Sequence, residues 1–189
     1  MELDMYVVRR VDVNRKNYGD DEQDSVQITR KGKLVEGFNP ERITKVEVEE
    51  ELVKWKNASH IHGWFVDNVQ NGQDDKEWHL LSCRDIEKLL EVCEKVLNGS
   101  HLVREPAFKA SGWKPIRQRM DTRGVPPMVM KNVSIAHKLL PLRLGRWDGP
   151  TDYGKQYLAD VETIRDWAES TLMKEDRGEL KGELYYRGH

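Results

Sequence analysis

Side chains that could do chemistry gather in one short stretch of this sequence. Two tryptophans, two histidines and a lysine lie within residues 55–64, namely Trp55, Lys56, His60, His62 and Trp64. Imidazole titrates near neutral pH, indole rings stack on planar groups, and an ammonium attracts anions. Residues that serve only as scaffold seldom combine these types, so we expect the stretch to contribute to a binding site. It does not by itself specify a reaction.

The spacing of apolar residues around this stretch predicts one long amphipathic helix over residues 44–70. Thr44 and Glu47 form a capping-box pattern with further acids after them, and Asn71-Gly72 supplies a stop. Apolar residues recur at a helical period, at Val48, Leu52, Trp55, Ala58, Phe65, Val66 and Val69. On such a helix His62 falls within the apolar stripe, whereas His60 and Trp64 project from nearly the opposite side.

The separation of the two histidines argues against a metal site. Two ligands on one helix face need a spacing of three or four, and His60 and His62 are two apart. We therefore expect no bound metal. His62 is either a core imidazole with both nitrogens satisfied or a histidine on the floor of a ligand pocket. Lys56 is expected beside the stripe as a surface charge, and Trp64 either anchors a second core or contacts a partner.

Positive charge is concentrated in the second half of the chain. Residues 104–146 contain ten Lys or Arg and two acids, a net charge of +8, whereas the whole chain has a net charge of -2. Five of the seven prolines lie in the same segment, so residues 100–127 are predicted to form a looped basic insertion. This insertion is either a solvated loop or an arm that offers Arg117, Arg119, Arg123 and Trp113 to an anionic partner.

Composition narrows the class of protein. A chain of 189 residues is enough for one domain with a real core, so we expect a single domain over residues 1–189. The sequence has neither an apolar leader nor a run long enough to span a bilayer, which predicts a cytoplasmic protein without a membrane partner. A net charge of -2 and the lack of a nucleic-acid-binding motif make us expect no nucleic-acid partner.

Local patterns predict an α+β fold: a small sheet packed against about three amphipathic helices, with a proline-rich basic insertion. Strands are predicted over residues 3–13 and 78–81, and a hairpin over residues 26–35. Ser82 and Asp85 cap a second helix that ends at Asn98-Gly99, and Thr151 or Asp152 caps a third. Residues 128–140 form a strand pair or another ordered return to the core. The tail over residues 175–189 is expected to fray or to pair with another subunit.

Several segments resemble a family of small, uncharacterised proteins encoded by tailed bacteriophages, prophages and mobile elements. The resemblance rests on Leu3-Asp4-Met5-Tyr6, on Trp55-Lys56-x-Ala58-x-x-Ile61-His62-x-Trp64-Phe65-Val66-x-Asn68-Val69-Gln70, and on Leu139-Leu140-Pro141 with Gly145, Gly149, Thr151-Asp152-Tyr153 and Tyr157-Leu158. The family usually has Arg-Lys where this chain has Lys56-Asn57, and it is rich in phenylalanine where this chain has residues 146–148. The insertion after Gly99 also exceeds the usual family length.

The resemblance implies an accessory protein that blunts a host defence or adjusts host metabolism. One way to do so is to bind and sequester a nucleotide signal without turnover and without a cofactor. Residues suited to such a pocket are present: Trp55, Trp64, Tyr153 and Tyr157 could stack a base, while Lys56, His62 and one of Arg117, Arg119 and Arg123 could meet a phosphate.

Two alternatives stay open. The protein could be a small hydrolase with His62 as general base and Asp4, Asp74 or Asp75 as its orienting partner or as a metal ligand, although no sequence motif places these residues together. It could instead inhibit a host protein through its segregated charges. Self-association as a homo-oligomer is expected in every case, because Trp64, Trp113, Trp147 and Tyr185-Tyr186 offer more aromatic surface than one small core readily hides.

Overall fold

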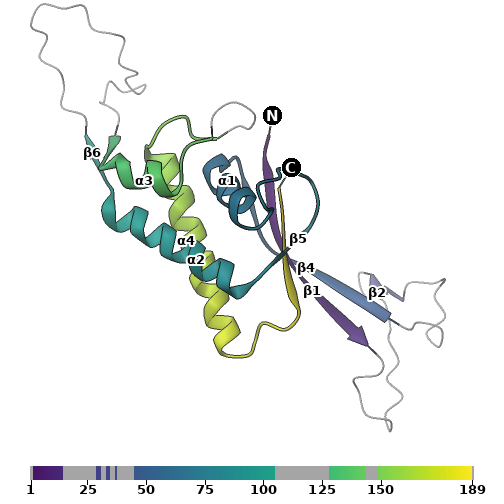
Figure 1. The fold of residues 1–189 in the computed structure, drawn as a ribbon. Coiled ribbons are helices and arrows are strands. Elements are labelled where there is room, and N and C mark those ends of the chain that lie inside the picture. Colours follow the sequence, from purple (N-terminus) through teal and green to yellow (C-terminus); the bar gives the residue numbers. More distant parts are fainter. Residues whose placement is uncertain are drawn as a thin grey trace, which may run out of the picture.

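The main sheet of the protein has four antiparallel strands in the order β4-β1-β8-β5. The computed structural model describes residues 2–14, 29–30, 33–34, 37, 45–104, 128–143 and 149–188. The strands of the sheet are β1 (Asp4–Asn14), β4 (Lys45–Lys56), β5 (His79–Leu81) and β8 (Glu183–Gly188). Together with the helices, this sheet confirms the predicted α+β class (Figure 1).

Two short antiparallel ribbons accompany the sheet. The first pairs β2 (Thr29–Arg30) with β3 (Lys33–Leu34), which confirms the predicted hairpin, and the second pairs β6 (His101–Arg104) with β7 (Met128–Lys131). The expected loop over residues 100–127 is therefore wrong at its start, because residues 101–104 form β6. Trp113, Arg117, Arg119 and Arg123 lie outside the described residues.

Four helices are present in the described parts of the chain, and they lie on one side of the main sheet (Figure 1). They are α1 (Ser59–Asn68), α2 (Cys83–Gly99), α3 (Val133–Leu139) and α4 (Lys155–Asp176). The predicted capping box at the start of α2 is confirmed, since Ser82 and Asp85 each accept a bond from the other's backbone N–H. The N-cap of α4 is Gly154, not Thr151 or Asp152.

The single helix predicted over residues 44–70 is wrong. Residues 45–56 are β4, a turn follows at Asn57, and only residues 59–68 are helical. The helix-like spacing of apolar residues in β4 comes from a register shift in its pairing with β1. Val7 pairs with Val53, whereas the next residue, Val8, pairs with Glu51. Leu52 is thus an extra residue in β4 and shifts the strand's alternation by one position. A spacing of four and then three between Val48, Leu52 and Trp55 imitates a helix for this reason.

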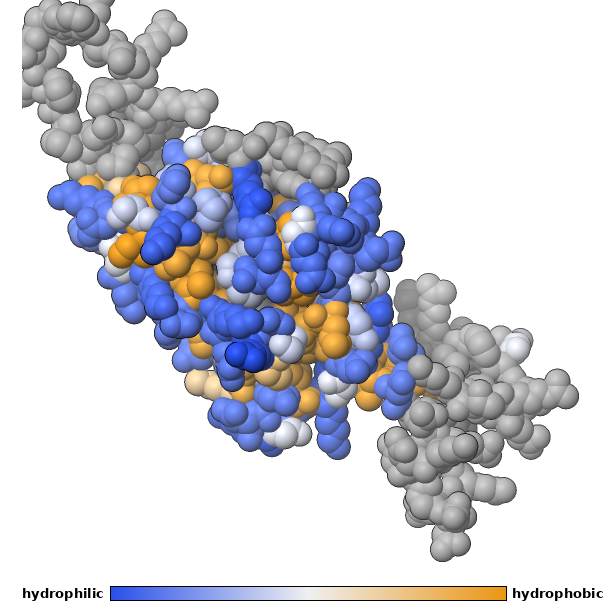
Figure 2. Space-filling view, in the orientation of Figure 1, coloured by the Kyte–Doolittle hydropathy of each residue, from blue (hydrophilic) through white to orange (hydrophobic). Residues whose placement is uncertain are grey.

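The core lies between the sheet and the helices. The first eight residues of α1, from Ser59 to Val66, are all buried, so this helix is enclosed on every side. Phe65 of α1 stacks on Tyr186 of β8 with ring centroids 3.8 Å apart, which ties the helix to the middle of the sheet. The outward faces of the helices are largely hydrophilic in the view of Figure 2, with hydrophobic side chains visible between them.

The C-terminal tail is part of the fold. The expectation that residues 175–189 fray or pair with another subunit is wrong, because α4 continues to Asp176 and β8 lies between β1 and β5 in the sheet. Leu184 and Tyr186 are buried in alternation with more exposed neighbours, as expected for a strand with one covered face. Within the described ranges, no helix has the length and apolar character needed to cross a bilayer.

Candidate functional site

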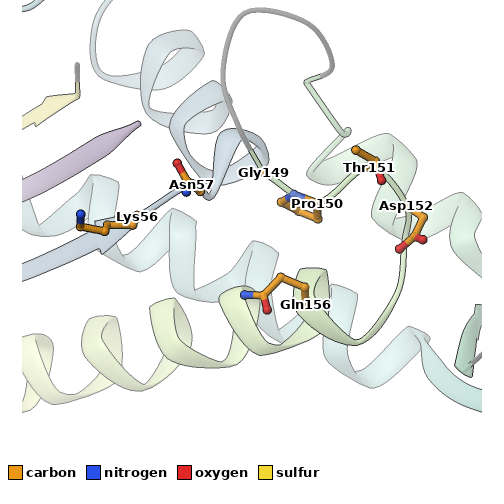
Figure 3. A pocket seen from close by; sticks show the side chains of 7 residues that line it. All are labelled: Lys56, Asn57, Gly149, Pro150, Thr151, Asp152 and Gln156. Carbon is orange, nitrogen blue, oxygen red and sulfur yellow. The ribbon is translucent and has the colours of Figure 1, made fainter. Parts of the chain in front are cut away.

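A cleft opens where β4 ends, α1 begins and the first turn of α4 comes close. It has a volume of about 500 Å³, and it is lined by Lys56, Asn57, Gly149, Pro150, Thr151, Asp152 and Gln156. Figure 3 shows Lys56 and Asn57 on one side, Thr151 and Asp152 on the other, and Gly149 and Pro150 between them. Segments that lie about ninety residues apart in the sequence thus form one concave surface.

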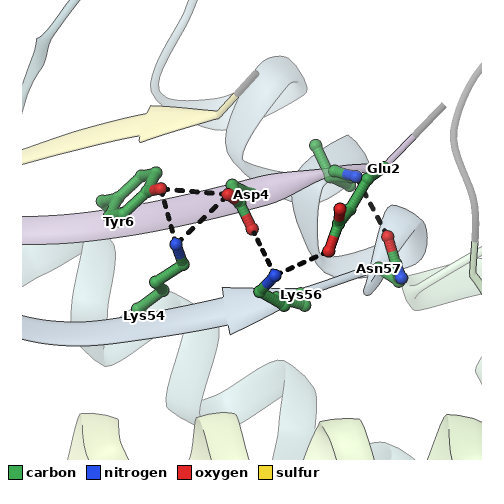
Figure 4. Close-up of polar contacts among 7 residues, drawn as sticks. Glu2, Asp4, Tyr6, Lys54, Lys56 and Asn57 are labelled. Atoms are coloured by element: carbon green, nitrogen blue, oxygen red, sulfur yellow. Dashed lines mark hydrogen bonds and ion pairs between the residues drawn. The ribbon is translucent and has the colours of Figure 1, made fainter.

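Lys56 is the basic residue of the cleft, and a network of polar side chains holds it (Figure 4). Its Nζ lies 2.6 Å from Glu2 Oε1 and 3.6 Å from Asp4 Oδ1. Lys54, two residues earlier, reaches the same carboxylate, with Nζ 3.2 Å from Asp4 Oδ2, and donates to the Tyr6 hydroxyl at 2.8 Å. The two lysines therefore share Asp4, but only Lys56 lines the cleft.

The ionisation of these groups follows from their contacts. The hydrogen bond to Glu2 raises the pKa of Lys56, and the hydrogen bond to the Tyr6 hydroxyl raises that of Lys54. Burial alone would raise the pKa of Asp4, but hydrogen bonds from Lys54 and Tyr6 outweigh it and leave this pKa below its usual value. Both lysines thus stay cationic and Asp4 stays anionic at neutral pH.

Asn57 shapes the junction between strand and helix. Its backbone has a φ of 56°, in the left-handed region that asparagine tolerates better than most residues. Its side-chain Oδ1 accepts from Leu3 N at 3.0 Å, and its own N–H donates to Leu3 O at 2.8 Å. These two bonds fix the turn against the start of β1 and so hold α1 at the edge of the cleft.

Both helices that begin at the cleft lack side-chain caps. The N-cap residues are Ala58 for α1 and Gly154 for α4, neither start has a side-chain capping bond, and neither first turn contains an acid. The first backbone N–H groups of a helix have no partner within it, and they carry the positive end of the helix dipole. Among the described residues that line the cleft, Asp152 is the one carboxylate, and a Cβ placed on Gly154 would lie 2.6 Å from its Oδ1.

Several buried polar atoms near the cleft have no hydrogen-bond partner among the described residues. They are Ser59 Oγ, both ring nitrogens of His60, and Asp160 Oδ2. Ser59 and His60 are each only 1% exposed. Burial lowers the pKa of His60 to about 3, so its ring is neutral, and burial raises the pKa of Asp160 to about 6 although Gln156 donates to its Oδ1. Unpaired groups of this kind are costly in a folded protein.

His62 lies in a separate hydrogen-bonded chain. Its Nδ1 is 2.7 Å from the Tyr186 hydroxyl, and its Nε2 is 3.1 Å from Asp74 Oδ1. Burial raises the pKa of Tyr186 well above its ordinary value, so this hydroxyl keeps its proton and donates to Nδ1, and Nε2–H donates to the carboxylate. Both nitrogens of the imidazole are thereby engaged, as the core interpretation of His62 requires.

The aromatic residues expected to stack a base pack inside the protein. Trp55 and Trp64 are each 7% exposed, and Tyr157 is fully buried. Trp55 meets Trp167 edge to face with centroids 5.2 Å apart, and Trp64 meets Phe65 in the same way at 5.4 Å.

The two tyrosines belong to the same packed interior. Tyr157 stacks on His60 with centroids 4.4 Å apart and donates to Leu140 O at 2.9 Å. Tyr153 is half-buried against Tyr157, and its hydroxyl accepts from Leu142 N at 3.3 Å. Neither tyrosine is among the residues that line the cleft.

The predicted site residues are thus only partly brought together. Lys56 lies at the cleft, whereas Trp55, His62, Trp64, Tyr153 and Tyr157 are not among the residues that line it. Sequence reasoning missed the binding potential of Asn57, Gln156 and the segment 149–152. The turn-forming run Gly149-Pro150-Thr151-Asp152 was the available signal, because such runs often form loops that carry function.

Cations and aromatic rings alternate on the sheet face turned away from the helices. Arg10 lies over Trp78 and Tyr185, Arg187 over Trp78 and Tyr6, and Lys54 over Tyr6, at 4.5 to 6.0 Å from the ring centroids. Val8 is paired with Tyr185 on this face and is only 3% exposed. These alternating cations and rings, a cation-aromatic ladder, cover this face of the sheet. The faces of the aromatic rings are already in contact with cations.

Comparisons of the chain with models of protein families, with curated proteins and with solved structures give no significant match.

Proposed function

We propose that the protein binds a small anionic ligand, of the nucleotide class, in the cleft beside Lys56 and holds it without turnover. The observation that carries this proposal is that one cleft is lined by the ammonium of Lys56, by Asn57 just before the N-cap of α1, and by Gln156 in the first turn of α4. An ammonium and the positive end of a nearby helix dipole both attract anions, so this cleft favours a ligand with a phosphate.

The volume and polar lining of the cleft suit a nucleotide better than a bare anion. A volume of about 500 Å³ falls within the ordinary range for small-molecule sites. An ammonium has three donors, so Lys56 can bind a ligand while it keeps Glu2 and Asp4. Asp152 accepts hydrogen bonds and Gln156 both accepts and donates them, which suits the hydroxyl or amino groups of a nucleoside.

The arrangement of His62 favours binding over catalysis. A general base needs a free lone pair directed at the reacting atom, and the nitrogens of His62 are engaged by Tyr186 and Asp74. Asp74 does orient His62, as the hydrolase alternative supposed, but Tyr186 occupies the nitrogen that catalysis would require. We therefore assign His62 a structural role in the packing of α1 against β8.

The biological setting follows from the resemblance to proteins of phages and mobile elements. In that setting, sequestration of a nucleotide signal would prevent activation of a host defence. The alternative of an inhibitor that binds a host protein rests mainly on the basic segment 104–146, of which residues 105–127 and 144–146 lie outside the described part of the chain.

Lys56→Gln tests the proposed function, with Lys54→Gln as its matched control. Both lysines lie on the same side of β4 and contact Asp4, but only Lys56 lines the cleft. We expect Lys56→Gln to weaken binding of the best ligand from a panel of mononucleotides and cyclic dinucleotides by roughly tenfold, as for a lost charge-assisted hydrogen bond. Calorimetric titration measures the affinity. Equal losses in both variants, or no loss in Lys56→Gln, would contradict the proposal.

A further inference from the structure

The two charged side chains of the cleft lie on opposite sides of it. Lys56 lines one side and Asp152 the other, with Gly149 and Pro150 between them (Figure 3). A ligand that fills the cleft therefore meets a positive charge at one end and a strong hydrogen-bond acceptor at the other. Because the phosphate of a nucleotide belongs beside the ammonium, the group that reaches the carboxylate must carry hydrogen-bond donors.

The carboxylate of Asp152 is available to such a group. Its side chain is exposed, and it has no hydrogen bond or ion pair with another described residue. A Cβ placed on Gly154 would lie 2.6 Å from Asp152 Oδ1. The carboxylate thus occupies the space that a side chain at position 154 would take, and the glycine leaves it room.

The backbone next to Asp152 is anchored to the rest of the fold. Tyr153 O accepts from Met130 N of β7 at 3.2 Å, and the Tyr153 hydroxyl accepts from Leu142 N at 3.3 Å. A carboxylate on a segment held in this way loses little conformational freedom when a ligand binds. It can therefore distinguish ligands by the positions of their donors.

Among the common bases, guanine matches a carboxylate best. Its N1–H and its 2-amino group lie side by side on the Watson–Crick edge, so one carboxylate can accept a hydrogen bond from each. Adenine and cytosine present an amino group beside a ring nitrogen with a lone pair, and uracil presents one N–H between two carbonyl oxygens. A carboxylate is repelled by these neighbouring acceptors.

We propose that the ligand is a guanine nucleotide, with the Watson–Crick edge of its base on Asp152 and its phosphate beside Lys56. This assignment rests on the proposed function and deepens it, because it names the base and the residue that selects it. Asp152 is the residue that determines specificity, and Gly154 leaves its carboxylate room to face the base.

Asp152→Asn tests this assignment, and Asp176→Asn, at the opposite end of α4 and outside the cleft, is its matched control. Calorimetric titration compares the monophosphates of guanosine, inosine and adenosine, and the inosine compound differs from the guanosine compound only in lacking the 2-amino group. We expect wild type and Asp176→Asn to prefer the guanosine compound over the other two by about tenfold, as for one charge-assisted hydrogen bond. Asp152→Asn should reduce this preference to about threefold or less.

Gly154→Ala moves the carboxylate of Asp152 without removing its charge. The backbone of Gly154 is extended, with φ of −118° and ψ of −156°, and so accepts alanine. The added Cβ displaces only the end of the Asp152 side chain. We expect this variant to bind the inosine compound as wild type does and to lose the preference for guanosine monophosphate, as measured by the same titrations.

The outcomes separate this assignment from the proposed function. If nucleotides bind through Lys56 but wild type does not distinguish guanosine monophosphate from the other two, the assignment is wrong and the proposed function stands. Tighter binding of all three compounds by Asp152→Asn would mean that Asp152 only repels the phosphate, and would also overturn the assignment. If guanosine itself binds through Asp152 and Lys56→Gln changes nothing, the base site stands and the anion site does not. If no nucleotide binds, both proposals fail.

Discussion

At the scale of single residues, the sequence predicts which side chains are chemically notable better than it predicts the contacts that each of them makes. Lys56 was expected at the surface and lies at the rim of the cleft. The sequence allows His62 to be a core imidazole or a pocket residue, and only the positions of Tyr186 and Asp74 decide between the two. Those partners lie 124 and 12 residues away, so no local pattern could have indicated the hydrogen-bonded chain.

Asp160→Asn should stabilise the protein near neutral pH. Burial raises the pKa of Asp160 to about 6, above its value in an unfolded chain, so the folded state favours the protonated acid. The stabilisation from Asp160 is therefore fully present only below the pKa of the unfolded chain, about 4, and is lost as the pH rises through about 6. Denaturant unfolding at several pH values should show a gain for the variant at pH 7 on the order of 1 kcal/mol, less than the full pKa shift implies because water screens this partly exposed carboxyl, and the gain should disappear below about pH 4.

The exposed neighbour Glu162 on the same helix supplies the control for Asp160. Glu162→Gln should leave the free energy of unfolding within about 0.5 kcal/mol of wild type, as is usual for surface substitutions. A gain for Asp160→Asn that is the same at both pH values would mean that the carboxyl is not held in its neutral form by burial.

At the scale of elements, the errors of sequence reasoning share one physical origin, which is long-range pairing. The extra residue Leu52 makes the apolar spacing of β4 resemble that of a helix, and only the register against β1 reveals it. The sequence predicts a tail over residues 175–189 that frays or pairs with another subunit, yet β8 is held on both sides by β1 and β5. Helix α2 needed no distant partner and was predicted with its cap.

Tyr186→Phe tests whether α1 and β8 are joined through His62. Phenylalanine keeps the stacking on Phe65 but leaves Nδ1 of His62 without its donor. We expect a loss of about 1–3 kcal/mol in the free energy of unfolding, as for a buried acceptor left unpaired, with ligand affinity unchanged. Chemical denaturation measures the first quantity and calorimetric titration the second.

Tyr185→Phe, one residue earlier on the opposite face of β8, is the control for Tyr186. Its hydroxyl donates to the exposed Glu183, so its removal should change stability by less than about 0.5 kcal/mol. A variant Tyr186→Phe that folds with full stability but loses its ligand would place His62 in the binding site instead.

At the scale of the whole molecule, the α+β class followed from the sequence because alternating and helical patterns both occur over long enough runs. The cleft could not be predicted from the sequence, because the segment 149–152 and the end of β4 are distant in the chain and come together only in the folded protein. Part of the aromatic surface expected to drive self-association is covered within the monomer: Trp64 and Tyr186 are buried, and Arg10 lies over the ring of Tyr185. Trp113 and Trp147 lie outside the described residues.

The central claim is that the cleft retains an intact anionic ligand through Lys56. The measurement that tests it most directly is mass spectrometry of the small molecules released by heat from protein that has been incubated with a bacterial lysate and repurified. We predict an unaltered nucleotide from wild type and Lys54→Gln, and at most about one tenth of that amount from Lys56→Gln. Equal recovery from the two variants, recovery of a chemically altered product alone, or no ligand from wild type would contradict the claim.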